Sequence, residues 1–264
     1  MRKLLTRAIA AGALLVAFSV YGDTSNLVFY SDFENSEDDQ PIITLADLNG
    51  ATLAPPSVFD QTPPNGWVAL SLHRVPANSN GRFRQGAASQ VAYIAMTKNA
   101  TGLSAAMAYP APFSGVSAVR FSYDFQPNSG NKGLAQIITG YDANNNSVFT
   151  IKMNSIAGSP QYLVSVNDES IGYAFRSGNS GNPLNSISLL LDSTGITVTL
   201  INSSTLETIT KYGIPPKNGF TQLSRFKLES EKNLASNFDY DNFQVWAISK
   251  VPPPPRLDLY IITP

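Results

Sequence analysis

The sequence predicts an all-β domain made of two antiparallel sheets stacked as a sandwich. Beyond residue 22, short runs of β-branched and aromatic residues alternate with clusters of Gly, Asn, Asp, Pro and Ser, a pattern typical of strands and turns. Within these runs apolar residues recur at every second position, and helical periodicity is nearly absent. Parallel strands would need crossover helices, so these strands should pair antiparallel. So many strands must close into a barrel or stack, and we favour two curved sheets.

The expected strands follow one another at short spacing. The clearest one, Ala118–Gln126, alternates so that Arg120, Ser122 and Asp124 share one face. Hairpin turns are expected at residues 142–146, 167–170 and 192–195. The first of these turns alternates oxygen-bearing side chains as a calcium loop does, but it lacks the Gly and the distant Glu of an EF-hand and is interpreted as a plain turn. Residues 35–84 are expected to form long loops with short strands. The other expected strands are Leu27–Ser31, Val91–Met96, Leu103–Tyr109, Leu134–Tyr141, Val148–Met153, Tyr162–Val166, Ile171–Phe175, Ile187–Leu191, Ile196–Ile201, Thr208–Tyr212, Leu223–Leu228 and Asp241–Ile248.

The N-terminus has the pattern of a secretory signal peptide. Three basic residues precede an uncharged run, Ala8–Val20, which is too short to span a hydrocarbon core of about 30 Å. We expect residues 1–22 to be a cleaved signal peptide, with an uncleaved membrane anchor as the alternative. Residues 23–250 should form the sandwich domain, and residues 251–264 a Pro-rich linker and short tail. The prediction is a secreted protein, extracellular or periplasmic, with no membrane span in the mature chain.

Composition excludes several classes of function. Removing residues 1–22 takes away three cations and no anion, so the formal charge of −1 becomes −4, and nucleic acid is a poor partner. The absence of cysteine excludes thiol catalysis, thiolate metal sites and disulfides. The single histidine, His73, excludes a zinc site made of several histidines. No Gly-rich phosphate loop follows a strand and opens a helix, so a nucleotide is not indicated.

Three segments resemble a known group of proteins. Leu27–Glu34 contains Asp32-Phe33-Glu34, similar to the opening of many bacterial sandwich modules, and Phe238–Val245 contains an Asp-Asn-Phe triplet similar to their last strand. The hairpins of the centre, notably the one around Gly195, are the third segment. Over most of residues 27–248 the chain thus resembles the concanavalin A-like lectin/glucanase superfamily, including laminin-G-like and carbohydrate-binding modules. The resemblance implies a jelly-roll sandwich and glycan recognition, although fold does not determine function.

The resemblance also implies a structural calcium ion. In this superfamily the first and last strands often lie side by side, and their carboxylates can hold the metal. By that likeness Asp32, Glu34, Asp239 and Asp241 could converge as hard oxygen ligands. The alternative is that these acidic residues are turn and strand-edge residues that face water.

Aromatic residues are the candidates for a glycan platform. The C–H face of a pyranose is apolar while its hydroxyl groups need polar partners, so flat rings beside amides suit it. Trp67 follows a Pro- and Gly-rich stretch and is the first choice for a surface platform, with Tyr141 as a further candidate. Alternation places Trp246 beside Gln244, on the face opposite Phe243. Each of these aromatic residues could instead fill the core.

The predicted function is a secreted, non-catalytic binding module for a polysaccharide or glycan. Retaining glycosidases need two carboxyl groups about 5 Å apart. The superfamily's glucanases present them as Glu-x-Asp-x-x-Glu on one strand, and nothing here matches, because Glu229 and Glu231 have the wrong spacing. No lyase motif surrounds His73, so no catalytic residue is assigned. The alternatives are a structural or adhesive cell-surface protein, and a glycoside hydrolase or polysaccharide lyase. The sequence does not determine the oligomeric state.

Overall fold

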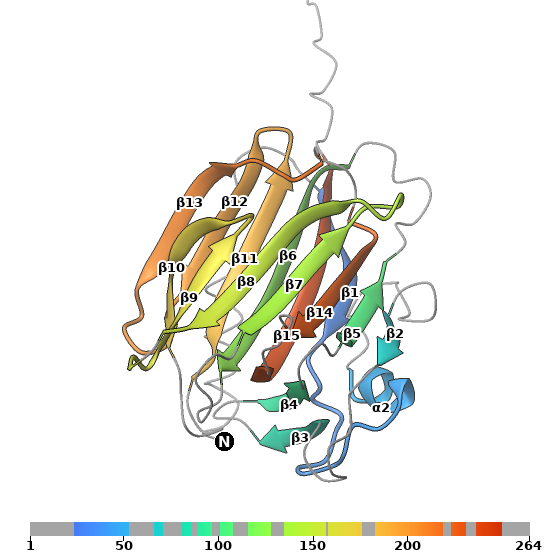
Figure 1. Ribbon diagram of the computed structural model, residues 1–264. Coiled ribbons are helices and arrows are strands. Elements are labelled where there is room, and N and C mark those ends of the chain that lie inside the picture. The colour runs from blue at the N-terminus through green and yellow to red at the C-terminus, as the bar shows by residue number, and fades with distance from the viewer. Residues whose placement is uncertain are drawn as a thin grey trace, which may run out of the picture.

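Two antiparallel sheets pack face to face and enclose the apolar core, which confirms the predicted sandwich (Figure 1). The structure is a computed structural model that describes residues 24–52, 66–70, 81–85, 89–96, 101–107, 116–127, 135–156, 158–175, 183–218, 223–230 and 236–249. The expected signal peptide, His73 and the C-terminal tail lie outside the described residues, so the domain boundaries stay predictions. In the described part of the chain no helix has the length and apolar character needed to cross a membrane.

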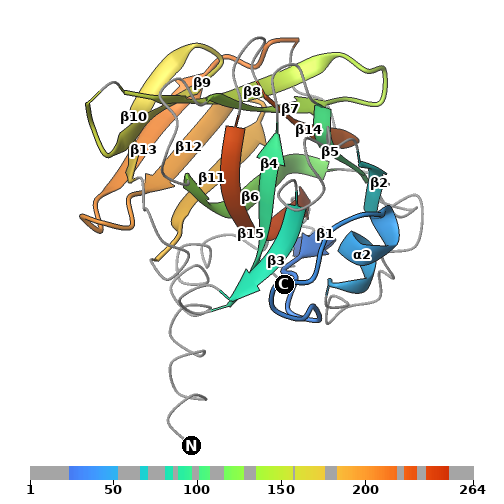
Figure 2. The ribbon, with the colours of Figure 1, turned by 60° about the horizontal axis from the view of Figure 1, so that its bottom comes forward.

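The first sheet, sheet A, has eight strands and contains both ends of the described chain. Seven strands lie in the order β13-β12-β11-β6-β15-β4-β3, and β1 also pairs with β15. Figure 2 shows β3 and β4 beside β15 at one edge of this sheet. The strands are β1 (Thr24–Ser31), β3 (Gly81–Gln85), β4 (Gln90–Met96), β6 (Val116–Pro127), β11 (Asn185–Asp192), β12 (Gly195–Ile201), β13 (Thr208–Ile214) and β15 (Ser236–Ser249).

The second sheet, sheet B, has seven strands in the order β10-β9-β8-β7-β14-β5-β2. Its first four strands are joined by hairpins, so neighbours in sequence are neighbours in space. The strands are β2 (Gly66–Leu70), β5 (Thr101–Ala106), β7 (Ala135–Tyr141), β8 (Ser147–Ser155), β9 (Gln161–Val166), β10 (Glu169–Phe175) and β14 (Arg225–Ser230).

The three predicted hairpins are confirmed as β7–β8, β9–β10 and β11–β12. Each turn contains at least one residue with positive φ, such as Asn145 (63°) and Gly195 (128°), and these residue types tolerate that conformation. In the β7–β8 turn one oxygen of Asp142 accepts the backbone N–H groups of Asn144 and Asn146 at 2.9 and 2.7 Å. These bonds form an Asx-type turn, which closes the predicted hairpin.

The first and last described strands lie side by side, as the resemblance implies. β1 pairs antiparallel with β15 from Thr24 opposite Ser249 to Ser31 opposite Phe243. β15 also pairs with β6 along its other side, so it lies in the interior of sheet A. The N-terminal and C-terminal segments are therefore both parts of one sheet.

The expectation of loops and short strands over residues 35–84 is incomplete, because this segment also contains the helix α2 (Leu45–Gly50). The carboxylate of Asp47 accepts the backbone N–H groups of Ile43 and Thr44 at 2.9 and 2.7 Å, which caps the helix start. Leu48 is buried against the core. A helix of six residues carries fewer than two turns, too few for a periodicity that the sequence could show.

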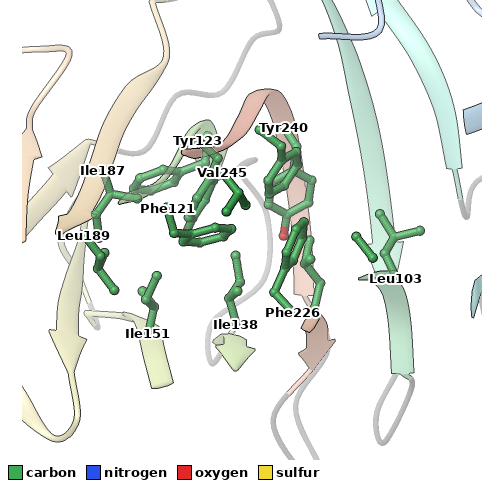
Figure 3. Close-up of a cluster of buried hydrophobic side chains, with 14 of the residues drawn as sticks. Leu103, Phe121, Tyr123, Ile138, Ile151, Ile187, Leu189, Phe226, Tyr240 and Val245 are labelled. Atoms are coloured by element: carbon green, nitrogen blue, oxygen red, sulfur yellow. The ribbon is translucent and has the colours of Figure 1, made fainter. Parts of the chain in front are cut away.

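The alternation of side chains along each strand explains which residues form the core. In β11, Ile187, Leu189 and Leu191 are buried, while the residues between them are half-buried on the outer face. Figure 3 shows side chains of sheet A, such as Phe121 and Tyr123, pointing toward Ile138 and Phe226 of sheet B. Aromatic rings fill the space between the sheets through stacked and edge-on contacts.

Phe243 lies at the centre of these ring contacts. Its ring stacks on Tyr123 and Phe226 at centroid distances of 5.1 and 5.5 Å and meets Trp67 edge-on at 5.3 Å. Because it is fully buried, removing the ring would leave a cavity that several rigid neighbours line.

We therefore expect Phe243→Ala to lower the free energy of unfolding by about 3–5 kcal/mol. The matched control is Tyr212→Ala, which removes an aromatic ring that is 75% exposed and should change stability by less than about 0.5 kcal/mol. Guanidinium unfolding followed by tryptophan fluorescence measures both. Equal losses for the two variants would contradict the central position of Phe243 in the core.

Candidate functional site

The prediction that Trp67 is a surface platform is wrong. Its side chain is 2% exposed, and its indole N–H donates to Ser31 Oγ at 3.0 Å within the core. The rings of Phe29 and Phe226 meet it edge-on at 5.5 and 5.6 Å. Asn49 of α2 bonds both backbone groups of Trp67, which fixes β2 against the helix. The Pro- and Gly-rich stretch before Trp67 thus leads into a strand whose tryptophan is a core residue.

The predicted placement of Trp246 on the face opposite Phe243, beside Gln244, is confirmed, and its role in binding stays a prediction. Phe243, Val245 and Ala247 face the core, and Gln244 and Trp246 lie half-buried on the outer face of sheet A. The indole N–H of Trp246 donates to the side-chain oxygen of Gln244 at 2.9 Å. This bond holds the two side chains together and leaves the amide NH₂ of Gln244 as a donor beside the ring.

Strand register gives the neighbours of this pair. Trp246 lies between Leu27 of β1 and Arg120 of β6, and Gln244 lies between Tyr30 and Ser122 of the same strands. We call these side chains the Trp246 face, and its six members are Leu27, Tyr30, Arg120, Ser122, Gln244 and Trp246. Leu27 and Ser122 are buried, and the other four are half-buried. The face thus joins an indole ring to an amide, a guanidinium and hydroxyl groups within two cross-strand rows.

Tyr141 does not belong to this face. It ends β7 in sheet B, and a side chain at the preceding Gly140 would enter the core, so Tyr141 lies on the outer side of sheet B. The guanidinium of Arg225 lies over its ring, 4.5 Å from the centroid, and donates to Asn145. The predicted ligand residues therefore separate into one pair on sheet A, one residue on sheet B and one in the core.

Acidic side chains gather next to the Trp246 face. Asp241 pairs in register with Asp124 across β15 and β6. Burial, followed by the nearby charges of Asp124 and Glu34, raises the pKa of Asp241 well above its usual value, although donors from Ser89 and Asn242 oppose the shift. Burial likewise raises the pKa of Asp124, to which the side-chain amide of Asn242 donates at 2.8 Å.

Tyr30 links this acidic group to the Trp246 face. Its hydroxyl donates to Asp32 at 3.0 Å, and burial together with the charges of Asp32, Asp241 and Glu34 raises the pKa of Tyr30. The sequence did not predict that Asp124 and Asn242 belong to this acidic group. The signal for Asp124 was present, because the alternation of β6 placed it on the same face as Arg120 and Ser122.

These carboxylates do not fit a calcium site in the described part of the chain. Among those residues, no group of three or more potential ligands is arranged to hold a metal ion. The oxygens of Asp32 accept from Tyr30 and from the backbone of Glu34, and those of Asp241 accept from Ser89 and the backbone of Asn242. Asp239 lies one row further along β15, opposite Tyr93 and Gln126. Donors of the protein thus occupy the oxygens of Asp32 and Asp241 that calcium would need.

Comparison with known proteins gives structural likeness only. No protein-family model matches the sequence, and no curated protein matches it. Similar solved structures include a protein of unknown function from Shewanella oneidensis MR-1, with 12% identity, coverage of 94% of this chain and 96% of that chain, and a TM-score of 0.47. The CBM2 module of the evolved Dit protein of Lactobacillus casei BL23 phage J-1 has 10% identity, coverage of 89% and 100%, and a TM-score of 0.42. Basic winged bean lectin with Tn-antigen has 15% identity, coverage of 64% and 90%, and a TM-score of 0.38.

Polysaccharide lyase and glycoside hydrolase domains are also among the similar structures. Each of these proteins is similar to this chain in fold alone. Binding and catalytic proteins occur together among them, so a function for this chain must rest on its own residues.

Asp241 gives a prediction about pH. Its folded carboxyl keeps a proton at a pH at which an unfolded aspartate, with a pKa of about 3.9, has lost it. The folded state then binds more protons, so this residue's contribution to stability falls as the pH rises through that window. We expect the unfolding free energy of the wild type, relative to Asp241→Asn, to decrease above about pH 4, by up to about 1.4 kcal/mol per pH unit.

Denaturant unfolding of both proteins between pH 3.5 and 8 measures this difference. Glu169→Gln is the control, because Glu169 is exposed and its pKa is lowered by Lys211, so its contribution should change in the opposite direction. A wild-type advantage over Asp241→Asn that grows with pH would contradict the assigned shift.

The calcium expectation has a separate test. Since the donors of the protein already hold these carboxylates, we expect dialysis against EDTA to leave the melting temperature unchanged. A metal bound to the native state alone would stabilise it, so its removal would lower the melting temperature. A decrease that added Ca²⁺ reverses would show that our interpretation of these hydrogen bonds is wrong.

Proposed function

We propose that the protein is a secreted binding module that recognises a polysaccharide or glycan on the Trp246 face of sheet A. The observation that supports this most is the bonded pair of Trp246 and Gln244 on the outer face of the sandwich. An indole ring can cover the apolar C–H face of a pyranose, and the free amide donors of Gln244 can bind its hydroxyl groups.

The row next to this pair supports the same function. Ser122 is flanked by Gln244 on one side and Ser188 on the other, and Thr199 and Thr210 continue the row across β12 and β13. A row of hydroxyl groups across a sheet is a surface that a polymer rich in hydroxyl groups can follow. The row is uncharged beyond β6, which suits a neutral sugar ring better than a nucleic acid.

Binding fits the geometry better than hydrolysis does. Asp124 and Asp241 are register partners on neighbouring strands, so their carboxyl groups are the nearest candidates for the carboxyl pair of a glycosidase. However, the side chain of Asp241 is fully buried and accepts from Ser89 and the backbone of Asn242. A carboxyl group held in this way cannot reach a glycosidic bond, so we assign the pair a structural role.

Trp246→Ala should weaken retention on the recognised glycan by about tenfold or more, because it removes the stacking surface. Tyr173→Ala is the matched control, since Tyr173 is 47% exposed on a strand of sheet B and its loss should leave binding unchanged. A glycan array followed by calorimetry on the best ligand measures both, and unchanged melting temperatures show that the variants fold.

Two outcomes would contradict the proposal in different ways. Wild-type binding that Trp246→Ala leaves intact would place the site elsewhere on the molecule. Failure of the wild type to bind any glycan would remove the function itself, and self-association detected by light scattering would then favour the structural or adhesive alternative.

A further inference from the structure

Strand β3 places two guanidinium groups on the same outer face of sheet A. Phe83 is fully buried in the core, so its neighbours Arg82 and Arg84 point to the opposite side. Tyr93 of β4 lies opposite Arg82 in register. The guanidinium carbon of Arg84 is 3.5 Å from the centroid of the Tyr93 ring, and that of Arg82 is 5.5 Å away. We call these three side chains the Arg84 stack.

The two arginines differ in their partners. Arg82 forms an ion pair with Asp39 at 3.2 Å. The Arg84 guanidinium makes no hydrogen bond or ion pair with any residue that the structure describes, and its Nε is buried without an acceptor. A buried nitrogen without a partner occurs in Arg84 only at Nε. The two terminal nitrogens also have no partner among the described residues, so they must be exposed to solvent.

In this arrangement the positive charge of Arg84 has no ion-pair partner among the described residues, and its Nε has no acceptor. Two cations share one ring, and of the two only Arg82 has an ion pair with a described residue, while a buried donor without an acceptor is unfavourable. The Nε of Arg82 is also buried without an acceptor. An oxyanion that accepted from Arg84 would balance the remaining charge, and a planar guanidinium binds such a group through two parallel hydrogen bonds.

The stack is held in place before any ligand arrives. β3 pairs with β4 on one side, and on the other side Phe83 exchanges backbone hydrogen bonds with Asp39 and Gln40 at 2.9 Å. Tyr93 is 8% exposed, so its ring is a rigid support for Arg84. Fixing the guanidinium in advance reduces the entropy that binding must overcome.

The Arg84 stack and the Trp246 face lie on one surface. Tyr93 is opposite Asp239 of β15, which lies seven positions before Trp246, or roughly 23 Å at about 3.3 Å per residue. The acidic residues between them, Asp239 and Asp241, are buried at 1% and 0% exposure. A single extended chain molecule can therefore contact the indole at one end and the guanidinium at the other.

We propose that the Arg84 stack binds an oxyanion of an acidic polysaccharide, either a uronate carboxylate or a sulfate ester. This inference rests on the proposed function and specifies the class of glycan that the same surface takes. Arg84 donates hydrogen bonds to the oxyanion, Tyr93 orients Arg84, and Trp246 stacks on a sugar ring further along the polymer.

The test measures the affinity of the full chain for oligogalacturonate, dextran sulfate and neutral dextran by calorimetry at two salt concentrations. The wild type should prefer an anionic polymer, and the preference should shrink at high salt. Arg84→Gln should weaken binding of that polymer by about tenfold or more. Arg84→Lys keeps the charge without the planar fork and should give an intermediate loss.

Arg225→Gln is the matched control, because Arg225 stacks on Tyr141 in the same way on the outer side of sheet B. It should leave all three affinities unchanged. Preference for oligogalacturonate would identify a carboxylate ligand, and preference for dextran sulfate a sulfate ester.

Three results would overturn the inference. Equal binding of anionic polymers by the wild type and Arg84→Gln, with both folded by thermal unfolding, would leave Arg84 a structural residue. Binding of neutral glycans that depends on Trp246, without preference for anionic ones, would overturn this inference and keep the proposed function. Failure to bind any glycan, neutral or anionic, would overturn both.

Discussion

Strand β15 determines where the polar and apolar side chains of sheet A lie. It pairs with β6 along one side and with β4 and then β1 along the other, so it connects β1, β3 and β4 to the rest of the sheet. At Asn242, whose φ is 51°, the register with β6 shifts by a bulge. Because of that extra residue, Phe238 and Tyr240 before it and Phe243 and Val245 after it all face the core.

The same bulge organises the outer face. Without it, a strict two-residue period would turn Gln244 and Trp246 into the core and bring Phe243 to the surface, given the observed positions of Phe238 and Tyr240. The bulge also brings Asn242 to Asp124, where its side-chain amide satisfies a carboxylate that burial would otherwise penalise. One irregular residue thus places Trp246 on the outer face and the side-chain amide of Asn242 beside Asp124.

The sequence predicted the layers better than the surface. Strand alternation identified the three hairpins and placed Trp246 and Gln244 together, because those segments are long enough for a period of two to be unambiguous. It failed for Trp67, since a short apolar run after a Pro- and Gly-rich stretch fits a loop as well as a buried strand, and the contacts with Asn49 and Ser31 come from distant parts of the chain. The Arg84 stack was not anticipated for the same reason. The stack forms because Tyr93 lies under Arg84 and no described residue pairs with the Arg84 guanidinium. Both facts follow from the packing of β3 against β4.

The pairing of β1 with β15 also affects how the chain can fold. The two strands are more than two hundred residues apart in sequence, yet they are hydrogen-bonded neighbours. Closing so long a loop must wait until the last strand has been synthesised, and contacts of this kind slow folding. A chain made from its N-terminus onward therefore keeps β1 without its partner until β15 has been synthesised, and sheet A reaches its final form only after that.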